Sequence, residues 1–137
     1  MTLIDSSAWI EYYRKSGDRH YKKNIITILT ENKAAICGII KTEILVHTKT
    51  KKEYRLIKSD FYGLTWFETD INVYNKASEI GFSLKKKGIT IPATDLIIAA
   101  CALTNNSFLL HFDKHFEQIK KIFPLQTISY NLLKHEQ

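Results

Sequence analysis

Four acidic side chains stand where carboxylates could act together on one substrate. Asp5 ends the apolar stretch TLID, and Asp113 directly follows SFLLHF. Asp95 opens the nearly apolar stretch DLIIAACALTN, and Glu43 lies inside IIKTEILVHT. Carboxylate oxygens without a cluster of thiolates or imidazoles suit Mg²⁺ or Mn²⁺ rather than zinc. Such an ion can neutralise a phosphodiester oxygen and activate a water for attack on phosphorus. The residue types therefore suit a divalent-metal site, and phosphodiester chemistry is one reaction that such a site could support.

Each of these acids also has a purely structural explanation. Asp5 and Asp113 could cap the helices that follow them. Asp95 could stabilise the first turn of its helix, where backbone N–H groups favour negative charge. Glu43 could be a surface residue beside an apolar stripe. These explanations are independent of one another, whereas one shared site accounts for all four acids, so we favour the shared site.

The elements that would position these acids follow from the spacing of apolar residues. Strands are predicted at 2–5, 34–37, 64–68, 107–112 and 125–129. Helices are predicted at 6–16, 21–32, 39–48, 51–63, 71–87, 95–105 and 113–122. Because Pro92 blocks helical continuation, Thr94 is the expected N-cap of the helix that Asp95 opens.

Strands that alternate with helices predict an α/β fold with a central parallel sheet of four or five short strands, flanked by helices on both faces. In such sheets, ligands bind beyond the carboxyl ends of the strands. Asp5 and Asp113 fall at strand ends, so the four acids can converge on one edge of the sheet. The length fits a single domain, residues 1–137.

The chain carries an excess of positive charge. Lys and Arg number 20 against 14 Asp and Glu, which gives a formal net charge of +6. This balance favours a polyanionic partner such as nucleic acid, or an acidic protein segment. Lys51, Arg55 and Lys58 recur at helical spacing with Lys52 adjacent, which makes these four residues candidate RNA contacts. A solvated helix face is the other reading of the same group.

The compartment is predicted from what the sequence lacks and from its two cysteines. No apolar run approaches the roughly 18 residues that span a bilayer. The N-terminus has no basic segment followed by a long apolar core, as an export signal would. Cys37 and Cys101 lie in apolar stretches without CxxC spacing, which favours buried thiols. We expect a cytoplasmic protein that does not associate with a membrane.

The segments around the four acids resemble the PIN-domain nucleases, in particular the VapC-type toxins of bacterial toxin–antitoxin pairs. LIDSSAWIEYY is similar to the family's opening strand with its acid, hydroxyl residue and tryptophan, and IIKTEIL is similar to the helix with the second acid. PATDLIIAACAL is close to the family's most recognisable segment, and LLHFDKHFEQI is similar to its closing strand and turn. The resemblance covers essentially the whole chain, in order.

This resemblance implies a single PIN-like domain and a metal-dependent endoribonuclease that uses Mg²⁺ (or Mn²⁺). It implies an RNA substrate, a homodimer, and a cognate antitoxin that fills or blocks the acidic groove. Ser6 or Ser7 would lie beside the acids, and we count Ser6 and Thr94 as supporting residues. The implied catalytic and metal-binding acids are Asp5, Glu43, Asp95 and Asp113.

One departure from the family keeps an alternative open. The family usually has Thr or Ser at the position of His111, two residues before Asp113. A PIN-like module that binds RNA or a protein without cutting is therefore the main rival. His111 could contact a phosphate or serve packing, and His47, four residues after Glu43, could reach a metal or be structural.

Other classes of protein are less well supported by the sequence. No Ser/His/Asp order, Gly-rich phosphate loop or GxGxxG is present, so triad hydrolases, P-loop proteins and dinucleotide-binding proteins are not indicated. A phosphoryl-transfer receiver domain also clusters acids at strand ends, but it would need an adjacent acidic pair where LIDSS has one acid. The aromatic residues of AWIEYY and LTWFE are expected in the core and at interfaces rather than as platforms for base stacking.

Overall fold

The fold is an alternation of short strands and helices. The computed structural model describes residues 1–129, and the remainder of the predicted domain, residues 130–137, lies outside the described part. The strands are β1 (Thr2–Ile4), β2 (Ala34–Cys37), β3 (Thr65–Phe67), β4 (Phe108–His111) and β5 (Thr127–Ser129). The helices are α1 (Ser6–Tyr13), α2 (Arg19–Thr30), α3 (Gly38–Val46), α4 (Lys51–Asp60), α5 (Ile71–Lys86), α6 (Ala93–Thr104) and α7 (Lys114–Lys120), with a 3₁₀ turn, η1 (Phe61–Gly63), after α4.

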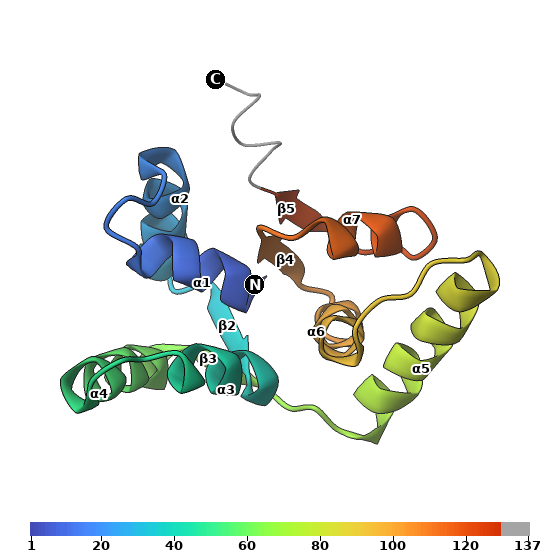
Figure 1. Ribbon diagram of the computed structural model, residues 1–137, viewed down its shortest axis with the longest axis horizontal. Helices are drawn as coiled ribbons and strands as arrows, with labels where there is room; N and C mark the ends of the chain where they lie inside the picture. The colour runs from blue at the N-terminus through green and yellow to red at the C-terminus, as the bar shows by residue number, and fades with distance from the viewer. Residues whose placement is uncertain (130–137) are drawn as a thin grey trace.

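The five strands form one parallel sheet in the order β3-β2-β1-β4-β5. This confirms the predicted parallel sheet of four or five short strands. Chain order runs outward from β1 in one direction to β3, then crosses to β4 and β5 on the other side. Right-handed crossovers therefore place α1 to α4 on one face and α5 to α7 on the other. Figure 1 shows the two groups of helices on opposite sides of the strands.

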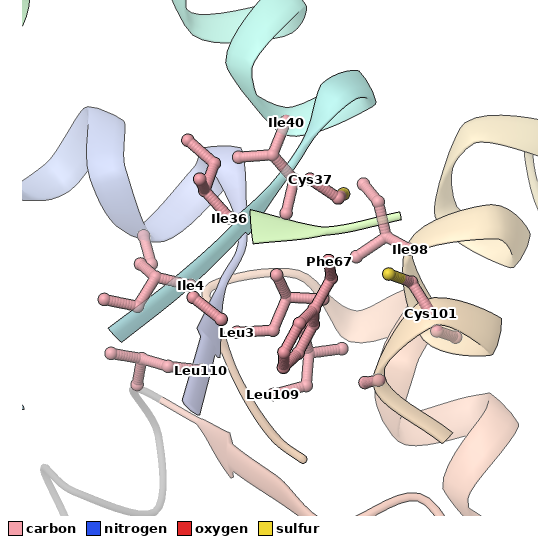
Figure 2. Close-up of a cluster of buried hydrophobic side chains, with 14 of the residues drawn as sticks. Leu3, Ile4, Ile36, Cys37, Ile40, Phe67, Ile98, Cys101, Leu109 and Leu110 are labelled. Atoms are coloured by element: carbon pink, nitrogen blue, oxygen red, sulfur yellow. The ribbon is translucent and has the colours of Figure 1, made fainter. Parts of the chain in front are cut away.

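The core fills both faces of the sheet. Leu3 pairs with Leu109, and Ile4 pairs with Leu110, so neighbouring strands present matched apolar side chains. Figure 2 shows Leu3 and Leu109 on the side of α6 and Ile4 and Leu110 on the opposite side. These four side chains are fully buried. Strands buried on both faces read as short continuous apolar runs, which is why TLI and FLL predicted strands without alternation.

The burial of the cysteine and tryptophan side chains tests the predictions made for them from the sequence. Cys37 and Cys101 are free, buried thiols, as expected. Trp9 is buried and its ring stacks on Tyr13, which confirms its place in the core. Trp66, in contrast, is 47% exposed on the edge strand β3. Within residues 1–129 no helix is both long enough and apolar enough to cross a membrane.

Several predicted helices run past the observed C-terminal ends, and the overrun is largest, at three residues, for the two predicted at 6–16 and 51–63. The first stops at Tyr13, and Arg14 already has extended backbone angles. The chain then doubles back so tightly that a Cβ on Gly17 would lie 2.1 Å from the carbonyl oxygen of Glu11, so a residue with a side chain would not fit there. The second, predicted over 51–63, is α-helical only to Asp60 and ends in the 3₁₀ turn η1.

The prediction that Thr94 caps α6 is wrong. The N-cap is Pro92, with extended backbone angles, and Thr94 is an exposed residue inside the first turn. Proline fixes its own φ and forces the residue before it away from helical angles, so the helix can begin directly after Pro92. No side chain caps α6, and Asp95 is the acid of its first turn.

Candidate active site

The predicted acids gather at the point where the strand order reverses. The strands on the two sides of this point are β1 and β4, and ligands in doubly wound sheets bind beyond the carboxyl ends of such strands. Asp5 directly follows β1, and its N–H donates to the Leu110 carbonyl of β4 over 2.9 Å. Asp113 comes two residues after β4 and is the N-cap of α7. The fold therefore brings these two carboxylates to the same edge of the sheet.

Asp5 is the most deeply buried of the four acids, with 3% of its surface exposed. Its Oδ2 accepts hydrogen bonds from the Ser7 N–H, at 3.1 Å, and from the Ser7 hydroxyl, and so caps α1. Its Oδ1 is buried and has no hydrogen-bond partner. Burial, with repulsion from Asp95 and Glu43, raises the pKa of Asp5 to about 6, against the lowering effect of Ser7.

Glu43 faces Asp5 from α3. The hydroxyl of Ser6 donates to Oε1 of Glu43 over 3.2 Å, so Ser6 lies beside one of the predicted acids. Partial burial raises the pKa of Glu43, and the charge of Asp95 adds to this effect. His47 is exposed at the C-cap of α3, and its charge lowers the same pKa. Glu43 therefore belongs to the acidic cluster rather than to the outer surface.

Asp95 and Asp113 share one histidine. The Nδ1 of His115 lies 2.8 Å from Oδ2 of Asp95 and 3.2 Å from Oδ1 of Asp113. The backbone N–H of His115 also donates to Oδ1 of Asp113 over 3.0 Å. Partial burial raises the pKa of Asp95, with Asp113 acting in the same direction and the hydrogen bond from His115 opposing it. The charge of Asp95 thus interacts with every one of the other three acids.

This donor set fits a hard divalent ion. Asp95, Asp113 and His115 each offer one ligand atom, and the three atoms lie within 4.8 Å of one another. Asp5 and Glu43 lie outside that compact group, but their charges interact with that of Asp95. Oδ1 of Asp5 is buried without a hydrogen-bond partner and could act as a further ligand. Carboxylates crowded in this way repel, by about 4 kcal/mol for a pair 4 Å apart at an effective dielectric constant near 20. A bound cation would relieve that repulsion.

His115 is a site residue that sequence reasoning missed. The available signal was its position two residues after Asp113, at the start of a predicted helix, where a histidine can reach back to the capping acid. Its contact with Asp95 could not be read from the sequence, because Asp95 lies twenty positions away on another helix.

His111 proves to be a structural residue. It is 1% exposed, and both of its ring nitrogens are engaged. Nδ1 accepts the N–H of Asp113 at 3.0 Å, and Nε2 lies 2.9 Å from Oε1 of Glu117. Burial lowers the pKa of His111, so the ring is neutral and Nε2 is the donor. The ring therefore orders the turn that carries Asp113 and leaves no nitrogen for a phosphate contact.

The predicted basic stripe lies on α4. Lys51, Lys52 and Arg55 are exposed, and Lys58 is partly buried, with its ammonium 5.6 Å from the centre of the Tyr54 ring. A groove of about 430 Å³ separates α4 from α1 and α3, and its lining includes Ile10, Tyr13, Ile44, His47 and Ile57. None of the four basic residues lines this groove; Lys52 and Lys58 instead line two neighbouring hollows of about 450 and 340 Å³.

Known proteins match this chain over most of its length. The model of the PIN domain family matches residues 2–122. The VapC ribonuclease Mb1587 of Mycobacterium bovis is 30% identical over 134 residues, which cover 95% of this chain and 99% of that protein. Ribonuclease VapC18 of Mycobacterium tuberculosis is 22% identical over 87% of each chain.

Solved structures show the same fold. The toxin–antitoxin complex VapBC2 of Rickettsia felis, bound to a fragment of promoter DNA, includes a chain that aligns with a TM-score of 0.77 at 20% identity, over 94% of this chain and 98% of that one. A chain of FitAcB from Neisseria gonorrhoeae aligns with a TM-score of 0.75 at 17% identity, over 93% and 96%. At these identities the likeness concerns the fold.

Proposed function

The chain belongs to the PIN domain family, and from this premise we propose that it is a metal-dependent endoribonuclease, the toxin of a toxin–antitoxin pair. The observation that carries the proposal is the convergence of Asp5, Glu43, Asp95 and Asp113 from four separate elements. The similarity to VapC ribonucleases over almost the full length of both chains supports RNA as the substrate. The reaction would be hydrolysis of an RNA phosphodiester.

Asp5, Asp95 and Asp113, with Glu43 beside them, would hold Mg²⁺ or Mn²⁺. When bound, such an ion neutralises phosphodiester oxygens and makes a coordinated water more acidic. The protein's own groups fix the acids in place. Ser7 holds one oxygen of Asp5, so that the other points away from the helix cap, and Ser6 holds Glu43. The His111 ring holds the turn of Asp113.

Glu43 is suited to move a proton. Burial and the charge of Asp95 raise the pKa of Glu43, and a carboxylate with a raised pKa accepts a proton more readily than an exposed one. The hydrogen bond from Ser6 to Oε1 fixes the orientation of the carboxylate. We therefore assign to Glu43 the acceptance of the proton that the attacking water loses.

The basic residues of α4 would contact the RNA backbone. Lys51, Lys52 and Arg55 are exposed on α4, and Lys52 lines a hollow of about 450 Å³ that Tyr13 of α1 also lines. Lysine and arginine at such positions attract phosphates and guide a polyanion toward a site without reading its sequence. The net charge of +6 acts in the same direction.

The partner would be an antitoxin protein. The structural neighbours include complexes of VapB with VapC, which supports a bound antitoxin here. Val46 and Leu56 are 72% and 58% exposed on α3 and α4, and side chains this apolar suit a surface that a partner covers. We also propose a homodimer, as the family suggests, and sedimentation velocity of the purified chain tests it.

The proposal that the chain binds RNA or protein without cutting loses its main support. It depended on His111 in place of a hydroxyl residue, yet the His111 ring accepts the Asp113 N–H and orders the same turn. A receiver domain is not favoured either, because the family model that matches is that of the PIN domain.

The test is cleavage of total RNA by the purified protein with Mn²⁺ or Mg²⁺, with and without EDTA. Asp5→Asn and Asp95→Asn should each lose at least about 100-fold in rate, because each removes a charged ligand. Asp70→Asn is the matched control, since Asp70 is an exposed acid that caps a different helix, α5. Cleavage that survives EDTA, or equal losses in all three variants, would overturn the proposal.

A further inference from the structure

His115 occupies the position that a cation ligand would take. It is the second residue of α7, and its ring reaches out of the first turn toward α6. Its Nδ1 lies between the carboxylates of Asp95 and Asp113, at 2.8 and 3.2 Å. Its side chain is 28% exposed, so the ring is neither locked in the core nor free in solvent. No other histidine within residues 1–129 makes an ion pair with one of the four acids of the site.

These distances match the spacing of neighbouring ligands around a six-coordinate ion. Bonds of about 2.1 to 2.2 Å at right angles put adjacent ligand atoms about 3 Å apart. The separations of Nδ1 from the two carboxylate oxygens bracket that value. An ion could therefore bind among the three atoms with small movements of the side chains.

An independent observation points to a ligand at the same place. Asp5 Oδ1 is buried without a hydrogen-bond partner, and the charge of Asp5 interacts with that of Asp95. A buried carboxylate oxygen without a partner is costly unless something absent from the free protein satisfies it. A cation beside Asp95 would do so.

We propose that His115 is a direct ligand of the divalent ion, together with Asp95 and Asp113, and that it biases the site toward Mn²⁺ over Mg²⁺. The inference rests on the metal-dependent function proposed above. Mg²⁺ binds oxygen ligands almost exclusively, whereas imidazole nitrogen is a good ligand for first-row transition ions. An all-carboxylate site would lack this bias, so the metal preference of the chain is a property of one histidine.

The competing role of His115 is a plain ion pair with Asp95 and Asp113. Hydrogen-bond distances and ligand spacings coincide near 3 Å, so only a measurement with the ion present separates the two roles. In the ion-pair role, a bound cation would compete with the imidazole for the carboxylates. Removal of His115 would then strengthen metal binding, whereas removal of a ligand weakens it.

The first measurement is pulsed electron paramagnetic resonance of the Mn²⁺-loaded protein. Wild type should show coupling to a ¹⁴N nucleus, which should become ¹⁵N coupling when histidine is ¹⁵N-labelled. His115→Ala should lose the coupling. His47→Ala is the matched control, because among residues 1–129 His47 is a second histidine whose charge acts on an acid of the site, and it should keep the coupling. A wild-type signal without nitrogen coupling would overturn the inference, whether or not the variants fold.

The second measurement is calorimetric titration of the EDTA-treated protein with each ion. His115→Ala should weaken Mn²⁺ binding by about tenfold or more and Mg²⁺ binding by about threefold or less. Tighter Mn²⁺ binding in the variant would show that His115 is only an ion-pair partner. Neither readout involves RNA, so a ligand role confirmed alongside absent cleavage would contradict the ribonuclease proposal alone.

Discussion

At the scale of single residues, Asp5 has two tasks that its two oxygens divide between them. Oδ2 caps α1 through Ser7, and Oδ1 is buried without a partner. The structural and chemical explanations of this acid are therefore not alternatives. A capping aspartate needs only one oxygen, which leaves the buried Oδ1 without a hydrogen-bond partner in the free protein.

Burial of the Asp5 carboxylate destabilises its charged form, and this predicts how the free energy of unfolding depends on pH. The pKa of Asp5 is about 6 in the folded protein, above its ordinary value of 3.8, so the folded state binds the proton more tightly than the unfolded state. Stability without metal should therefore fall as the pH rises from about 4 to about 6. A shift of about two pKa units corresponds to about 3 kcal/mol as an upper limit.

Asp5→Asn should accordingly be more stable than wild type at pH 7, by about 1 to 3 kcal/mol in EDTA. The difference should shrink toward zero at about pH 3, below both the folded pKa of about 6 and the ordinary value of 3.8, where the wild-type carboxyl is mostly protonated in both states. Urea unfolding at the two pH values measures it. An equal difference at both pH values, or a less stable variant at pH 7, contradicts the assigned cause.

Residue types predicted much of the site, within limits that geometry explains. The acids could be selected because their residue type is visible in the sequence, with Asp5, Asp95 and Asp113 near element boundaries, and the family resemblance added Ser6. The role of His115 could not be read from the sequence, because it depends on the distance between α6 and α7. Thr94 was predicted to be the N-cap of α6 because threonine favours that position, whereas Pro92 determines where α6 begins.

At the scale of elements, α4 places part of the chain's excess of basic residues on an exposed surface. Thr50 caps the helix by accepting the Glu53 N–H, and Ile57 is its one buried residue. A helix with so narrow an apolar face leaves most of its side chains in solvent. Its lysines and arginine are therefore available for an anionic ligand.

The salt dependence of RNA binding tests this assignment. In an Asp95→Asn background, which should not cut, a Lys51→Gln, Arg55→Gln double variant should bind single-stranded RNA more weakly. The slope of log affinity against log salt should become shallower by about 1.4, or about 0.7 for each lost phosphate contact. Fluorescence anisotropy between 50 and 200 mM salt, as a rough working range, measures the slope.

The matched control for α4 is Lys85→Gln, Lys86→Gln, which removes two charges from the last turn of α5. Those lysines suit the negative end of the helix dipole and need no ligand. If both double variants change the slope equally, the effect reports net charge, and α4 is not the RNA-binding element.

At the scale of the whole molecule, the alternation of strand-like and helix-like stretches of apolar residues was sufficient to predict the parallel sheet. It also predicted that helices cover both faces of that sheet. The strand order was not predictable, because it depends on which edge each crossover reaches. The chain passes from β3 at one edge to β4 beside β1, and this crossover creates the reversal where Asp5 and Asp113 meet. The same step lays α5 and α6 against the face that Leu3 and Leu109 occupy, as Figure 2 shows for α6.

If the acids at this reversal hold an ion as proposed, the stability of the whole domain should depend on metal. A ligand that binds only the folded state stabilises it by about 2.7 kcal/mol when its concentration is 100 times its Kd. Because acids from four elements surround the site, the gain should appear as a rise in the temperature at which the entire domain unfolds.

The most direct test of the shared ion is therefore calorimetric melting of EDTA-treated protein with increasing Mn²⁺. We predict that the melting temperature of wild type and of Asp70→Asn rises with Mn²⁺, while that of Asp95→Asn stays nearly constant. If Asp95→Asn gains as much as wild type, or wild type gains nothing, the four carboxylates do not hold a common ion.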